Sequence, residues 1–89
     1  MTATKRWTVD VYIDEHEDTT RAEARLRTRD DTQLTGVGTA HRNPSDVDVP
    51  EIGDELAVAR ALGELSRKLL RTAAEDIEDV THQPVHLDR

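Results

Sequence analysis

The first third of the chain alternates apolar and polar residues with a period of two, which is typical of half-buried β-strands. In the stretch 7–14, one face carries Trp7, Val9, Val11 and Ile13. The segment 14–18 then interrupts the alternation with four acidic residues around His16. We therefore expect a first strand over Trp7 to Asp14, followed by an acidic turn.

A second alternation begins at Thr19 and continues to Arg27. Ala22, Ala24 and Leu26 share one face, whereas the other face carries arginines and Glu23. This pattern predicts an antiparallel strand with one face in the core and the other in water.

A third strand is predicted over 34–41, after a polar connection formed by Asp30, Asp31 and Thr32. Leu34 and Val37 have opposite parity, so a single inward face would require a bulge near Gly36. A nucleotide-binding loop is a poor interpretation of Gly36 and Gly38, because such a loop lies between a strand and a helix.

From Ile52 to Val80 the apolar residues recur every three or four positions, which predicts a long amphipathic helix lying across the small residues of the sheet. Pro50 suits its first turn, and Pro84 ends it. A capping box beginning at Thr72 leaves open a break there. The expected fold is α+β, a three-stranded antiparallel meander followed by one C-terminal helix, in a single domain over residues 1–89.

Composition narrows the function. The formal net charge is −7, and charged residues make up 35% of the chain, so polyanions are repelled at long range. The absence of cysteine rules out disulfides and thiolate chemistry and fits a reducing cytoplasm. No apolar run at the start resembles a leader or a membrane span, so we expect a cytoplasmic protein without membrane partners. The small number of large apolar residues favours a homodimer, because one copy would bury little.

Residues suited to chemistry do not form a recognisable active site. His82 and His86 have the helical spacing of a zinc pair, but Pro84 between them disrupts it. No Gly-x-Ser-x-Gly nucleophile elbow is present. We therefore expect no catalytic residue, no metal site and no cofactor, and a small enzyme or metal-binding protein is the weakest of the alternatives.

The one cationic feature is an arginine row on the outward face of the second strand. It consists of Arg21, Arg25 and Arg27, with Arg29 just beyond. Such a row can bind phosphates or a partner's carboxylates. It can equally pair with acids of a neighbouring strand, here Asp10 and Asp14.

Several short motifs occur together in order along nearly the whole chain. They are Val9-x-Val11-x-Ile13-Asp14-Glu15-His16, Thr20-Arg21-Ala22-x-Ala24-Arg25-Leu26, Gly36-Val37-Gly38, Ile52-Gly53-Asp54-Glu55-Leu56-Ala57-x-Ala59-Arg60-Ala61-Leu62 and Thr81-His82-Gln83-Pro84-Val85. In these motifs the chain resembles the uncharacterised bacterial family labelled dsRBD-like. The resemblance implies the latter part of a double-stranded-RNA-binding domain without its first helix. It also implies dimers, a likeness in shape to ribosome hibernation factors, and a role in stress or dormancy.

These observations favour a non-enzymatic interaction protein that self-associates. The alternative is a ribosome- or RNA-associated factor that binds through the arginine row. A double-stranded-RNA binder needs cations where the helix begins. This chain has Glu51, Asp54 and Glu55 there, so we do not transfer RNA-binding residues to it.

Overall fold

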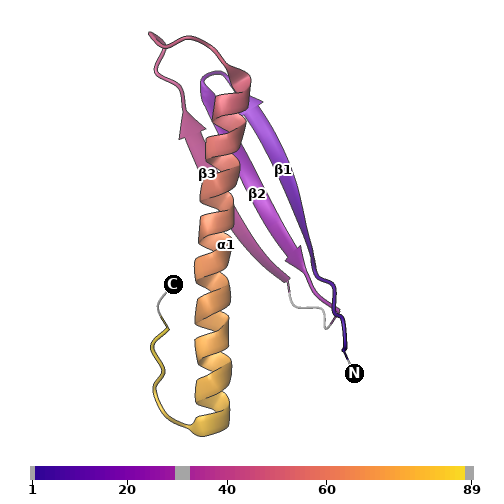
Figure 1. The fold of residues 1–89 in the computed structure, drawn as a ribbon. Coiled ribbons are helices and arrows are strands. Elements are labelled where there is room, and N and C mark those ends of the chain that lie inside the picture. The colour runs from indigo at the N-terminus through magenta and orange to yellow at the C-terminus, as the bar shows by residue number, and fades with distance from the viewer. Residues whose placement is uncertain (1, 30–32, 88–89) are drawn as a thin grey trace.

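The computed structural model describes residues 2–29 and 33–87. Three strands, β1 (Thr8–His16), β2 (Thr19–Arg27) and β3 (Gln33–His41), are followed by one helix, α1 (Pro50–Thr81). The strands pair antiparallel in the order β1-β2-β3, and the helix lies against one face of the sheet (Figure 1). This confirms the predicted α+β order. The connection expected at Asp30 to Thr32 falls outside the described residues.

The register between β2 and β3 is continuous, so the predicted bulge near Gly36 is wrong. Pairing runs one for one from Thr19 opposite His41 to Arg27 opposite Gln33. No described glycine has a positive φ. Val37 instead sits on the face away from the helix, and the small residues of β3 face the helix.

The two glycines of β3 are needed for close packing. An added Cβ on Gly36 would collide with the α1 backbone at Ala61, and one on Gly38 would collide with it at Ala57. The helix therefore lies directly on the strand, with hardly any side chain between the two backbones. The buried core that results is small: Ala22, Ala24, Leu26, Ala40, Ala57, Ala61 and Leu65.

α1 is one continuous helix of 32 residues, so the break considered at Thr72 does not occur. The helix ends at Thr81, and the next residue, His82, adopts a left-handed φ of 59° and donates its backbone N–H to the carbonyl of Glu78. The C-terminal end of α1, past Leu69, extends beyond the sheet (Figure 1), and the molecule measures 53 × 31 × 21 Å. Within the described part of the chain, no helix is both long and apolar enough to cross a bilayer.

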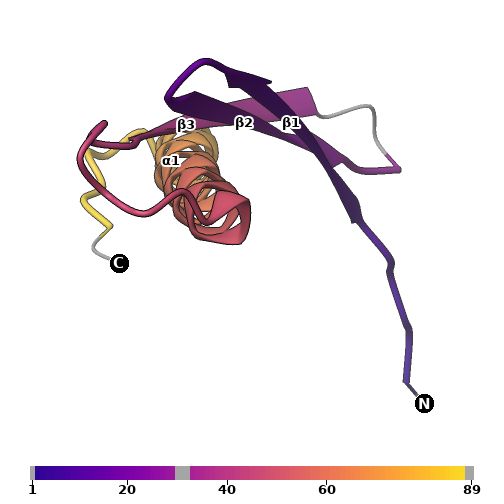
Figure 2. The same ribbon diagram turned by 90° about the horizontal axis from the view of Figure 1, so that it is seen from above.

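The helix covers β2 and β3 but leaves most of β1 uncovered, as the view from above shows (Figure 2). The alternation predicted that the apolar row of β1 would be half-buried, and in the structure this row stays exposed: Val9 is 42% exposed and Ile13 is 43% exposed. Side-chain size explains the displacement. The helix approaches closely only where the sheet presents Gly and Ala, and β1 presents Val and Ile.

Candidate interaction surfaces

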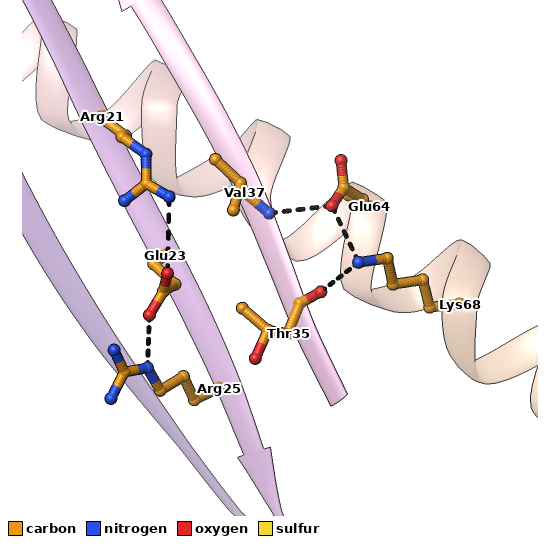
Figure 3. A network of polar contacts seen from close by, with 7 residues as sticks. All are labelled: Arg21, Glu23, Arg25, Thr35, Val37, Glu64 and Lys68. Carbon is orange, nitrogen blue, oxygen red and sulfur yellow. Dashed lines mark hydrogen bonds and ion pairs between the residues drawn. The ribbon is translucent and has the colours of Figure 1, made fainter. Parts of the chain in front are cut away.

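The arginine row lies on the sheet face that the helix does not cover, and Glu23 stands in its middle. Arg21 Nη2 is 3.5 Å from Glu23 Oε1, and Arg25 Nε donates to Glu23 Oε2 (Figure 3). Both contacts hold the pKa of Glu23 below its ordinary value, and the hydrogen bond from Arg25 contributes more than the one from Arg21. The acid that interrupts the row in sequence therefore serves as its counter-ion.

The rest of the row is also engaged. Arg27 Nε is 3.2 Å from Asp10 Oδ2 on β1, as the neighbouring-strand interpretation expected. The guanidinium of Arg25 also lies over the Tyr12 ring, 4.5 Å from its centroid. Arg29 is exposed, two residues beyond the end of β2. The structure thus gathers Arg21, Arg25 and Arg27 on one face, each beside a carboxylate.

The outer edge of β3 is occupied by side chains of α1. Lys68 Nζ donates to the carbonyl of Thr35 at 2.6 Å, and Glu64 Oε1 accepts from the N–H of Val37 at 3.1 Å (Figure 3). Arg60 Nη1 donates to the carbonyl of Thr39 at 2.7 Å. The bond from Val37 and then the one from Lys68 lower the pKa of Glu64. An edge that could template another strand is therefore blocked.

The helix lies under β2 and β3, away from the outer edge of β1 (Figure 2), and the register shows which residues face that edge. The side chains of α1 bond to backbone groups of odd-numbered β3 residues, so the backbone N–H and C=O groups of those residues point away from β2. The even-numbered residues of β3 therefore form the backbone hydrogen bonds to β2. Carried through both registers, this assigns the outward N–H and C=O groups of β1 to Val9, Val11 and Ile13. These same residues form the exposed apolar row on the helix side.

A second apolar surface lies on the side of α1 that faces away from the sheet. Ala59 and Gly63 follow the buried Ala57 and Ala61 by two residues, and two residues turn a helix by about 200°. An added Cβ on Gly63 would meet only the side chain of Arg67 of its own helix. The large residues on this side include Ile52, 54% exposed, Leu56, 45% exposed, and Ile77, 39% exposed.

This outer side was missed by sequence reasoning because the predicted stripe merged two faces. Leu65 of that stripe packs in the core, and Val58 and Leu69 pack against it. Leu56 and Ile77 belong to the opposite side. The signal that separates the two sides is the spacing of the outer residues. From Ile52 through Leu56 to Ile77 and Val80, these positions follow one another by strictly alternating steps of four and three residues, which a single wide stripe does not require.

A cleft of about 390 Å³ lies where α1 begins, between the β1–β2 turn and the loop 42–49. Its walls are held together by Arg42, which donates to Asp18 Oδ1 at 2.6 Å and to the carbonyl of Asp46 at 2.9 Å. A hydrogen bond and charge repulsion from Asp54 raise the pKa of Glu15. Oδ1 of Asp54 is buried and has no partner.

This acidic corner joins β1 to α1, but it does not have the form of a metal site. Among residues 2–29 and 33–87, no three His, Cys, Asp or Glu side chains converge in a way that could hold an ion. Both His82 and His86 follow the end of α1 and do not share a helix face. The candidate surfaces are therefore the two apolar ones, on β1 and on α1, with the neutralised arginine row third.

Known proteins with similar sequences cover nearly all of this chain. An uncharacterized protein of Mycobacterium tuberculosis (strain CDC 1551 / Oshkosh), MT1780, is 59% identical over 83 residues, which are 93% of this chain and 87% of the relative. Another, Rv2632c of Mycobacterium tuberculosis (strain ATCC 25618 / H37Rv), is 51% identical over 77 residues, covering 86% and 82%. Their names state no activity.

The fold has also been seen in a crystal. The crystal structure of Rv2632c matches with a TM-score of 0.84 and 47% identity, over 93% of this chain and 98% of that one. The family model described as Rv2632c-like matches residues 5–86. A match of that extent, together with these relatives, shows that the chain belongs to the Rv2632c-like family.

Proposed function

We propose that this protein is a non-enzymatic interaction protein that works as a homodimer. The observation that carries the proposal is where its large apolar side chains lie. The core is built mainly from alanine, and no large side chain of the described residues is fully buried. Large apolar residues stand instead on β1 and on the outer side of α1.

Burying such residues supplies the main driving force for association. An exposed aliphatic side chain gains roughly 1.5–3 kcal/mol on full burial. A single copy leaves much of this gain unused, and contiguous exposed apolar surface usually marks an interaction site. A second copy is always present at matching concentration, so self-association is the most economical use of this surface.

We place this role in the cytoplasm, which suits a chain without cysteine. A part in stress or dormancy physiology rests on the resemblance to the dsRBD-like family. RNA or ribosome binding is the competing function. Against it stand the net charge of −7 and the carboxylates beside Arg21, Arg25 and Arg27.

The test measures mass and salt dependence together. We expect size-exclusion chromatography with light scattering to give a mass near twice 10.0 kDa at micromolar concentration. We expect no retention on a double-stranded RNA column at low salt. A monomeric mass at every concentration removes the proposal. RNA retention that declines steeply with added salt would favour the competing function, because phosphate binding releases counterions.

A further inference from the structure

We propose that two copies of this chain join edge to edge through their β1 strands, which pair antiparallel about Val11 and double the three-stranded sheet. This rests on the proposed homodimer and names the surface that forms it. The backbone N–H and C=O groups of Val9, Val11 and Ile13 point away from β2, toward the outer edge. At the other edge of the sheet, the matching groups of β3 bond to side chains of α1. The helix lies away from β1 (Figure 2), so a second strand can add there through main-chain bonds.

The residues of β1 fit a second β1 when the two-fold axis passes through Val11. Only odd-numbered residues of β1 turn their backbone groups outward, so hydrogen-bonded pairs form where odd stands opposite odd. An axis at Val11 sets this residue opposite its own copy and sets Val9 opposite Ile13 on both sides of the axis. Each of these pairs can exchange two backbone hydrogen bonds. Their side chains share the helix side of the sheet, so the exposed apolar rows of both copies come into contact there.

The polar face of β1 is complementary in the same register. Asp10 comes to stand opposite Tyr12 of the second copy, and the guanidinium of Arg25 lies over the Tyr12 ring, 4.5 Å from its centroid. Each copy therefore presents a cation beside the position that the other copy's carboxylate takes. Asp14 comes to stand opposite Thr8, so within β1 the carboxylates of one strand do not oppose those of the other. Opposite charges on neighbouring strands are stabilising.

Axes one residue away from Val11 bring like charges together. An axis at Asp10 sets the two Asp10 carboxylates opposite each other. An axis at Tyr12 sets Asp10 opposite Asp14. Like charges directly opposite on neighbouring strands are destabilising, so these two registers are disfavoured.

Axes two residues away avoid like charges but lose apolar contacts. An axis at Ile13 sets Val11 opposite Glu15, which places a carboxylate in the apolar row. An axis at Val9 overlaps the two strands only over residues 8–10, because β1 begins at Thr8. The axis at Val11 overlaps them over residues 8–14, and it joins the two apolar rows without opposing like charges.

The outer side of α1 is the rival surface for a second copy. The backbone groups along the middle of a helix are bonded within it, so association there would rest on side chains alone. A segment of the same chain, Val85 to Leu87, also lines a groove with Leu70 and Ala74 of α1. The edge of β1 offers outward main-chain groups as well as apolar side chains, which favours it over the helix.

Val11→Lys tests the edge, because it sets two ammonium groups opposite each other at the axis. We expect the dimer dissociation constant, measured by light scattering, to rise at least roughly tenfold. Ile77→Lys is the matched control and should leave it unchanged: Val11 is 38% exposed, Ile77 is 39% exposed, and both variants gain the same charge. Val11→Glu should weaken the dimer likewise. Mixing the Val11→Glu and Val11→Lys proteins should restore a dimer, because opposite charges then meet at the axis. Circular dichroism checks that each variant folds.

Single cysteines test the register without background, because the chain has no cysteine of its own. Opposite residues of a hydrogen-bonded antiparallel pair have Cα atoms about 5.5 Å apart, which suits a disulfide. Under gentle oxidation, the Val11→Cys protein should form a disulfide with itself faster than the Val9→Cys or Ile13→Cys protein does. Mixing these last two proteins should give the mixed disulfide in excess. A self-disulfide that forms fastest at Val9→Cys or Ile13→Cys would overturn the axis at Val11.

Amide hydrogen exchange, followed by NMR, distinguishes the β1 edge from any other interface. The N–H groups of Asp10 and Tyr12 point toward β2 and should exchange slowly in monomer and dimer alike. Those of Val9, Val11 and Ile13 point outward, and pairing of β1 with its copy should slow their exchange at least roughly tenfold on going from dilute to concentrated protein. Unchanged exchange of these three amides in a dimeric sample would overturn the proposal.

The edge and the homodimer can fail separately. A dimer that survives Val11→Lys overturns the edge and keeps the homodimer, whether or not Ile77→Lys dissociates it. A mass of one copy at all concentrations, with no disulfide in the Val11→Cys protein, overturns both. Dissociation by Val11→Lys and not by Ile77→Lys, with slowed exchange of the outward β1 amides in the wild-type dimer, supports both.

Discussion

The carboxylate of Glu64 accepts a hydrogen bond from the backbone N–H of Val37, 3.1 Å away, so a helix side chain occupies the place of a neighbouring strand. This bond and the Lys68 ion pair hold the pKa of Glu64 below its ordinary value. A carboxylate with a lowered folded-state pKa stabilises the fold above its unfolded-state pKa. That stabilisation is lost as the pH falls through the folded-state value.

Glu64→Gln should therefore lower the thermal midpoint at pH 7 and flatten its decline at acidic pH. Scanning unfolding between pH 3 and 7 measures both effects. Glu75→Gln, farther along the same helix, is the control and should leave the acidic decline unchanged. Equal profiles for the wild-type protein and Glu64→Gln would show that the edge bond contributes nothing to stability.

The pKa of Glu15 is shifted in the opposite direction from that of Glu64. Its hydrogen bond with Asp54 and the nearby negative charge raise its pKa, so the folded state binds this proton more tightly than the unfolded chain. The contribution of Glu15 is therefore fully present below the unfolded-state pKa and is lost as pH rises through the folded-state pKa. We expect Glu15→Gln to raise the thermal midpoint at pH 7.

The control for that substitution is Glu17→Gln, which removes the same charge from the β1–β2 turn. It should have a smaller effect, because general charge relief is all it provides. A midpoint that responds equally to both variants would mean that the contact with Asp54 is unimportant.

Gly38 tests the close approach of sheet and helix. A methyl group there would collide with the backbone of α1 at Ala57, which cannot move aside as a side chain could. Gly38→Ala should cost at least about 2 kcal/mol of unfolding free energy, in the range of overpacked cores. Denaturation in urea measures it. Gly63→Ala adds a methyl where only Arg67 is near, and should be neutral or stabilising by about 0.5–1 kcal/mol.

Replacing Glu23 tests whether this carboxylate prevents the arginine row from binding polyanions. Glu23→Gln removes the carboxylate that Arg21 and Arg25 share. The variant should bind heparin–agarose at low salt more strongly than the wild-type protein and elute at a higher salt concentration. Glu17→Gln gives the same change in net charge and should elute with the wild type. Identical elution of the two variants would leave the arginines without any latent affinity for polyanions.

The local pattern sufficed for the strands and the helix, because periods of two and near 3.6 need only neighbours along the chain. The alternation of Val9, Val11 and Ile13 marked a strand correctly. The alternation could not reveal that the helix would pack on β2 and β3 and leave the apolar row of β1 exposed. That outcome depends on how closely a helix can approach Gly36 and Gly38, which compares side-chain sizes on different strands.

The polar surfaces were harder to read from sequence. Arg27 pairs with Asp10, as strand neighbours suggested. The sharing of Glu23 by two arginines depends on rotamers, and the covering of the β3 edge by Glu64 and Lys68 depends on where the helix comes to rest. Glu64 and Lys68 are four residues apart and bond to each other at 3.3 Å, but their spacing alone could not show that both also bond to the backbone of β3.

The helix that extends beyond its sheet has a hydrodynamic consequence. The radius of gyration is 16.8 Å, whereas a compact chain of 89 residues has a radius of about 12 Å. A lone molecule will therefore diffuse slowly and leave a gel-filtration column early, at the position of a heavier spherical standard. Calibration against globular markers alone would report a dimer where none exists, and only an absolute mass distinguishes an elongated monomer from a pair.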